Sequence, residues 1–76
     1  MPGRTRLRIL TLSADGPNTG GLAKSLGMSA ATVSAHTAAL RAAGLLTSVR
    51  DGKAVVHRRT ALGDLLLGSN PKVPQR

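Results

Sequence analysis

The sequence of 76 residues contains no cysteine, no aromatic residue and no glutamate. Without cysteine there can be no disulfide framework, no thiolate metal site and no cysteine nucleophile. Without phenylalanine, tyrosine or tryptophan, the core must consist of leucine, valine, isoleucine, methionine and alanine. No apolar run approaches the roughly 20 residues that cross a membrane, and no signal-peptide pattern follows the first residues. We therefore expect a cytoplasmic protein with no membrane partner.

Acidic residues are scarce, because three aspartates stand against eleven lysines and arginines and leave a net charge of +8. Such a balance indicates a polyanionic partner, most often nucleic acid, although a surface charged only for solubility is the alternative. The two histidines and the aspartates are a poor ligand set for a metal, and they form no serine–histidine–acid order. Gly20 and Gly21 lack the surroundings of a phosphate-binding loop. We expect no enzyme activity, no metal and no cofactor.

What is present is a chain long enough for one domain with a small core. The spacing of its apolar residues predicts a first helix over residues 4–14. The buried face of this helix is expected to carry Leu7, Leu10 and Ala14. Residues 15–18, DGPN, have the chemistry of a turn.

Two further helices are predicted around a glycine turn. Thr19 can cap a short helix over residues 20–26, and Gly27 ends it. Ser29 is a good N-cap for the next helix, which Gly44 stops. Two helices joined by such a turn are typical of a helix-turn-helix. The buried stripe of the longer helix is expected to consist of Val33, Thr37, Leu40 and Ala43.

The pattern then changes from a helical to an alternating period. Residues 46–50 and 53–59 are predicted to form the two strands of a β-hairpin, joined by the dipeptide Asp51-Gly52. The order of helix, helix-turn-helix and hairpin is that of a winged helix, in which the hairpin is the wing. The predicted fold class is therefore mainly α with a small β-hairpin (α+β), with three core helices plus the wing.

The end of the chain is predicted to add one short helix and a tail. Thr60 can cap a last helix over residues 61–67. The stretch at residues 68–76 contains two prolines and no periodicity, so we expect it to be disordered. The domain organisation is then a flexible N-terminus at residues 1–3, one winged helix-turn-helix domain over residues 4–67, and the tail.

Four motifs, in this order and spacing, resemble the ArsR-type winged-helix repressors. They are TRLRIL at residues 5–10, LAKSLG at 22–27, S-x-x-T-V-S-x-H-x-x-x-L-R-x-A-G-L at 29–45 and RDGKAVVH at 50–57. The sequence resembles in particular the DNA-binding domain that ends longer actinobacterial regulators. Since such domains bind operator DNA as dimers and repress transcription, the resemblance implies a repressor, at the nucleoid when bound, with a homodimer left open.

The third predicted helix would be the recognition helix. Its N-terminal half is expected to enter the major groove of double-stranded DNA, where small side chains allow close approach and can touch base edges. The alternative is an alanine-rich helix whose composition reflects helix propensity alone. No Arg, Asn or Gln lies between residues 29 and 40, so we expect modest sequence discrimination. The residues expected to meet DNA here are Ser29, Ala30, Ala31, Thr32, Ser34, Ala35 and His36.

Basic residues outside this helix are the expected phosphate contacts. Arg50 and Lys53 lie at the predicted wing tip, with Arg58 near them. Lys24 lies on the second helix. Neither histidine is expected to bind metal, and His57 is expected on the surface of the wing strand.

Two other functions remain open from the sequence. One is a protein-interaction winged helix that docks a partner through the same face. The other is a nucleic-acid binder that uses charge without reading the groove, although the absence of aromatic rings argues against single-strand stacking. Changes at Thr32, Ser34 and His36 should alter the preference among duplexes only if binding is sequence-specific.

Overall fold

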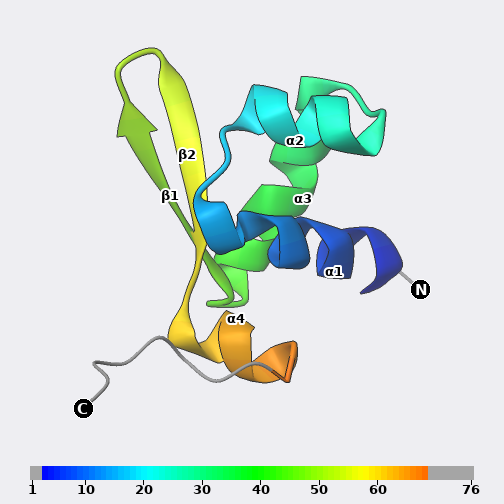
Figure 1. Ribbon diagram of the computed structural model, residues 1–76, viewed down its shortest axis with the longest axis vertical. Coiled ribbons are helices and arrows are strands. Elements are labelled where there is room, and N and C mark those ends of the chain that lie inside the picture. The colour runs from blue at the N-terminus through cyan, green and yellow to red at the C-terminus, as the bar shows by residue number, and fades with distance from the viewer. Residues whose placement is uncertain (1–2, 69–76) are drawn as a thin grey trace.

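The computed structural model describes residues 3–68, in which α-helices support a two-stranded antiparallel hairpin (Figure 1). This is the predicted winged helix-turn-helix, because the second and third helices form the helix-turn-helix and the hairpin forms the wing. No helix in this described part of the chain is long and apolar enough to cross a membrane. In chain order the elements are α1 (Gly3–Leu12), the 3-10 turn η1 (Ser13–Asp15), α2 (Thr19–Leu26), α3 (Ala30–Ala42), β1 (Leu46–Asp51), β2 (Ala54–Arg59) and α4 (Ala61–Leu66).

Helix α1 packs against α3 through a face that differs from the predicted one. Ile9 and Leu10 are buried, whereas Leu7 is 44% exposed. Ala14 is also exposed, because the α-helix tightens into η1 and its later residues leave the expected helical phase. Buried Ser13 occupies the core side instead, and its hydroxyl donates to the carbonyl of Ile9 at 2.7 Å. The prediction of Leu7 and Ala14 as core residues was therefore wrong.

The core lies between α1, α2 and α3, reaches the start of β1, and is entirely aliphatic. Ala43, predicted to be buried, is exposed because α3 ends at Ala42 and the chain reverses at Gly44, whose φ is 77°. Leu45 then packs against the core, and its N–H donates to the carbonyl of Leu40 at 3.0 Å. The buried apolar residues are Ile9, Leu10, Leu22, Val33, Leu40 and Leu46.

Side-chain caps fix where the helices begin. Helix α2 begins one residue earlier than predicted, because Asn18 rather than Thr19 is its N-cap and accepts the Gly21 N–H at 2.6 Å. The predicted N-caps Ser29 of α3 and Thr60 of α4 are confirmed. The correction at α2 leaves the Thr19 hydroxyl available for a contact with the wing.

The hairpin turn is shifted by one residue from the predicted position. Since Asp51 pairs with Ala54 at the end of the antiparallel ladder, the two turn residues are Gly52 and Lys53. Gly52 has a φ of 65°. The first of the two central positions is where a type II′ turn carries its glycine, which explains why the turn forms here.

Helix α4 approaches the turn between α3 and β1 closely. The Thr60 hydroxyl donates to the carbonyl of Gly44 at 2.7 Å and accepts the N–H of Gly63 at 3.0 Å. Gly63 is buried, and a Cβ at this position would collide with the carbonyl oxygen of Leu45. The start of α4 can pack at this depth only because residue 63 has no side chain.

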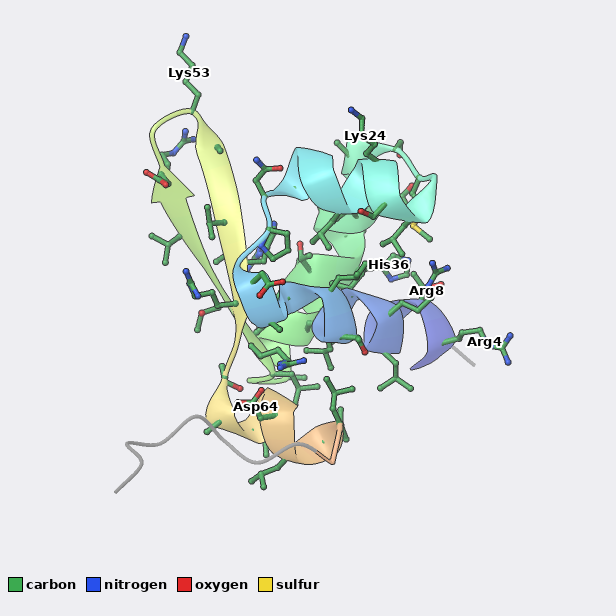
Figure 2. The ribbon with its side chains drawn as sticks, in the orientation of Figure 1. Arg4, Arg8, Lys24, His36, Lys53 and Asp64 are labelled. Atoms are coloured by element: carbon green, nitrogen blue, oxygen red, sulfur yellow. The ribbon has the colours of Figure 1, made fainter. Side chains whose placement is uncertain are left out.

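One arginine joins the end of the wing to two helices. The Nε of Arg59 lies 2.7 Å from Oδ1 of Asp64 on α4, and its Nη1 donates to the carbonyl of Leu10 on α1 at 3.2 Å. Both charged side chains are mostly buried. Figure 2 shows Asp64 at this junction. The predicted tail at residues 68–76 lies, apart from Gly68, outside the described residues, and Gly3 is the first residue of α1.

Replacing Gly63 by alanine should lower the free energy of unfolding by about 2–3 kcal/mol, because the new Cβ would push α4 away from Leu45. Gly20→Ala in α2 is the matched control, since a Cβ there meets only Oδ1 of Asn18, at 3.6 Å. The control should be neutral or more stable by up to about 1 kcal/mol, because alanine favours a helix. Urea denaturation followed by circular dichroism measures both variants. If Gly63→Ala and Gly20→Ala changed the free energy of unfolding equally, the close approach of α4 to Leu45 would be contradicted.

Candidate nucleic-acid interface

The N-terminal half of α3 presents a surface of small side chains. Val33, Thr37 and Leu40 are buried on the opposite side, and the Thr37 hydroxyl donates to the carbonyl of Ser34 at 3.1 Å. The core therefore fixes which side of α3 faces outward, and no charged side chain stands on its first two turns. Of the residues predicted to meet DNA, Ser29, Ala30, Ala31, Thr32, Ser34 and Ala35 are exposed and His36 is half-buried.

Two hydroxyl groups are fixed at the tip of this surface. The Ser29 side chain caps α3 by accepting the Thr32 N–H at 3.1 Å. Its own hydroxyl donates to Oγ1 of Thr32 at 3.0 Å. Since the Thr32 oxygen accepts this bond, its hydrogen points elsewhere and can be donated outward. The start of α3 thus presents an oriented hydroxyl donor next to alanine methyl groups.

His36 is oriented by helix α1. The Nε of Arg6 donates to Nδ1 of His36 at 3.3 Å. Because a guanidinium can only donate, Nδ1 must be the acceptor, and in the neutral ring the proton lies on Nε2. Arg6 is half-buried, whereas Arg4 and Arg8 on the same helix are exposed. Figure 2 shows His36 next to α1, so it lies at the edge of the small-residue surface rather than at its centre.

Basic residues flank the surface at one end of the molecule. Lys24 stands on α2 and Lys53 on the hairpin turn, and both point toward the same end in Figure 2. Lys24, Arg50 and Lys53 are exposed. Arg4 and Arg8 instead stand on α1, away from the wing tip. The fold therefore places Lys24 and the wing tip at the same end of the molecule.

Arg58 does not belong to the wing tip. It pairs with Thr47 near the base of the hairpin, and its guanidinium lies against Gly16, within about 3 Å of the position that a Cβ would occupy. Gly16 has a φ of 68°, so glycine is favoured there for its backbone as well. The prediction of Arg58 near the tip was wrong because the strands extend beyond it for several residue pairs.

His57 also lies elsewhere than the sequence predicted. It was expected on the wing surface, yet it is 1% exposed. Its Nε2 lies 2.7 Å from Oγ1 of Thr19 on α2, and its Nδ1 lies 2.7 Å from Oγ of Ser48 on β1. Ser48 also accepts a hydrogen bond from Nη1 of Arg41 at 3.0 Å. The sequence does not reveal the burial of His57, because Thr19, Ser48 and Arg41 come from three separate elements.

The loop before α2 explains why His57 is covered. The N–H of His57 donates to the carbonyl of Pro17 at 2.9 Å, and Asn18 forms an antiparallel bridge with Val56. The loop therefore lies along β2 like a short third strand. It brings the start of α2 over the imidazole and closes that side of the wing to solvent.

Burial lowers the pKa of His57 below its usual value of 6.5, and the positive charge of Arg41 lowers the pKa further. Burial and the charge of Arg41 both disfavour the protonated imidazole. The hydrogen bonds themselves are compatible with either neutral tautomer, since Ser48 and Thr19 can each donate or accept. The folded protein therefore holds a neutral imidazole between two hydroxyl groups.

Neither histidine belongs to a cluster that could bind a metal. Within residues 3–68, no three side chains of His, Cys, Asp or Glu come together in this way. His36 and His57 instead have separate protein partners, which are Arg6 for the first and Thr19 with Ser48 for the second.

The free energy of unfolding should fall as the pH is lowered below about 6.5, because the unfolded chain protonates His57 before the folded protein does. The loss continues down to the folded pKa and amounts to about 1.4 kcal/mol per unit of pKa difference. His57→Gln should be less stable at neutral pH but should lose this pH dependence. His36→Gln, which keeps His57, should retain it. Urea denaturation between pH 5 and 8 measures these slopes, and an unchanged slope in His57→Gln would contradict the assignment.

Comparison with known proteins agrees with the fold and the motifs. The family model described as "Bacterial regulatory protein, arsR family" matches residues 3–48, more than half of the chain. A search of curated proteins found no match.

Three solved structures illustrate the similarity. Reduced HlyU from Vibrio cholerae has a TM-score of 0.79 and 26% identity, over 90% of this chain and 74% of that one. Rv0081 from M. tuberculosis has a TM-score of 0.78 and 27% identity, over 88% and 70%. A predicted DNA-binding transcriptional regulator from E. coli has a TM-score of 0.69 and 25% identity, over 90% and 73%. The chain belongs to the arsR family of bacterial regulatory proteins, which are DNA-binding transcription regulators and not enzymes.

Proposed function

We propose that this protein is a repressor that binds specific double-stranded DNA, with the start of α3 in the major groove and the wing on the backbone or in the minor groove. The observation that carries the proposal is the exposed small-residue surface of α3, flanked at one end by Lys24 and the wing tip. A groove about 12 Å wide admits such a helix, and the flanking cations would then meet the phosphates on either side.

The chemistry of α3 favours contacts with methyl groups and single hydrogen bonds. Alanine and threonine methyl groups can touch the C5-methyl of thymine, and the outward Thr32 hydroxyl can donate to a base edge or a phosphate. His36, protonated on Nε2, would add a second donor toward an acceptor such as guanine N7. No side chain on this surface can make the bidentate base contacts of Arg, Asn or Gln. Discrimination by one copy would therefore be modest, and DNA shape would contribute.

A homodimer would supply the remaining affinity, and the apolar surface formed by α1 and α4 is our candidate interface. Leu62, Leu65 and Leu66 of α4 are 53–60% exposed, next to exposed Leu7 of α1. Leu7 and Leu66 also line a hollow of about 230 Å³, together with Ala39 and Leu40 of α3. Figure 1 shows α4 at the end of the molecule opposite the hairpin turn. Pairing there would bury leucines that cost free energy in water and would leave both α3 surfaces open.

Selection from a random duplex pool should enrich an inverted repeat with half-sites about one helical turn apart.

Affinity should fall steeply with salt, and Arg50→Ala with Lys53→Ala should reduce the slope of log K against log salt by about 2, because two phosphate contacts are lost. Thr32→Ala with Ser34→Ala should change the enriched sequence instead. The double variant Arg4→Ala with Arg8→Ala removes the same charge away from the wing and is the control. Salt-dependent binding without an enriched sequence would contradict specific recognition.

Leu65→Asp should weaken self-association by more than about tenfold, since a carboxylate would be placed in an apolar interface. Sedimentation velocity over a range of protein concentrations measures this. Val49→Asp is the control, because Val49 is 64% exposed on the wing, away from α4. If both variants associate like the unchanged protein, or if the unchanged protein is a monomer at all concentrations, the proposed interface is wrong.

A further inference from the structure

The buried His57 joins three elements that the sequence keeps apart. Its ring lies between Thr19 at the start of α2 and Ser48 on β1, at 2.7 Å from each, while its backbone belongs to β2. Arg41 of α3 extends the line by donating to Ser48 at 3.0 Å. One continuous chain of hydrogen bonds thus runs from α3, which carries the small-residue surface, through both wing strands to α2, which carries Lys24.

The wing tip projects beyond this junction. Three residue steps separate the pair Ser48–His57 from the last pair, Asp51–Ala54, which corresponds to about 10 Å of strand. Val49, Arg50 and the turn residues are exposed, and Figure 1 shows the hairpin extending away from the helices. A small rotation of the hairpin at its base would therefore displace the basic residues at its tip by a larger distance.

Backbone contacts alone hold the wing along one line. The bond from the His57 N–H to Pro17 and the bridge between Asn18 and Val56 both lie on the outer edge of β2. These two contacts by themselves leave rotation about that edge open, and Leu46 and Arg59 join only the base of the hairpin to the helices. The imidazole acts in a second direction, because it ties β1 through Ser48 and α2 through Thr19 at once.

We propose that His57 is a positioning residue for DNA binding, which fixes the wing tip relative to α2 so that Arg50, Lys53 and Lys24 reach one duplex together. This inference rests on the proposed function, in which these cations contact phosphates. His57 itself need not touch DNA. A rigid ring with a nitrogen at each end suits the role, since it can span two hydroxyl groups in a way that an aliphatic side chain cannot.

The test compares two isosteric changes near the wing. Thr19→Val removes the hydroxyl that meets Nε2 of His57. Thr47→Val is the matched control, because Thr47 is exposed on β1 next to Ser48 and its hydroxyl makes only a 3.4 Å contact with the carbonyl of Arg58. In each background, and in the unchanged protein, Arg50 and Lys53 are replaced together by alanine. Binding to a mixed-sequence duplex of about 25 base pairs is measured over a range of salt.

In the unchanged protein and in Thr47→Val, loss of the two cations should weaken binding about tenfold at low salt and reduce the salt slope by about 2. In Thr19→Val, the same loss should cost less than about threefold and change the slope by less than about 1, because the tip no longer meets the phosphates in a fixed position. Equal effects in all three backgrounds would overturn the positioning role alone. No effect of the two cations in the unchanged protein would overturn the wing contact of the proposed function, and this inference with it.

A second readout does not depend on DNA. Residual dipolar couplings of the wing amides in the free protein report the orientation of the hairpin relative to the helices. They should shrink at the wing tip in Thr19→Val and stay unchanged in Thr47→Val. Circular dichroism confirms that each variant is folded. Couplings that stay the same in all variants would overturn the proposal, because the wing would then be held without the imidazole.

Discussion

One neutral imidazole, that of His57, is buried where the wing meets the helices. A core of aliphatic residues in a chain of this length buries little surface, and it reaches the wing only at the start of β1. The rest of the hairpin is joined to the helices by polar contacts, among them the bond between buried His57 and Thr19 at 2.7 Å and the bond from Arg41 to Ser48 at 3.0 Å. Such bonds contribute most where water is excluded, since a partner left alone there would lose its solvation.

The base of the hairpin is joined to the helices by charged side chains. Arg59 connects the last residue of β2 to α1 and to Asp64 of α4. Thr60 then fixes α4 against the turn after α3. A protein without aromatic side chains thus uses short polar contacts where larger proteins use packed rings. Because these polar contacts are directional, they determine the angles between helices and strands and also stabilise the fold.

The placement of charge fits the task of a DNA-binding regulator. Long cationic side chains stand on α2 and on the wing tip, whereas the start of α3 carries alanine, serine and threonine. Cations around a groove attract the backbone of any duplex, so they increase affinity without selecting a sequence. Small groups within the groove select weakly but allow close contact. In the proposed binding mode, sequence preference would therefore come from DNA shape, from few base contacts and from the number of copies bound.

The sequence by itself determined the order of the elements, the turn glycines, the N-caps Ser29 and Thr60, and the small-residue face of α3, because each depends on residues within one or two turns of the chain. It failed where distant elements meet. The buried position of His57, the contact of Arg6 with His36 and the face of α1 that is buried depend on which surface lies against them. From local spacing alone, two neighbouring faces of a helix or strand are almost equally good candidates for burial. Only the tertiary structure decided between them, since burial is a property of the neighbours and not of the residue alone.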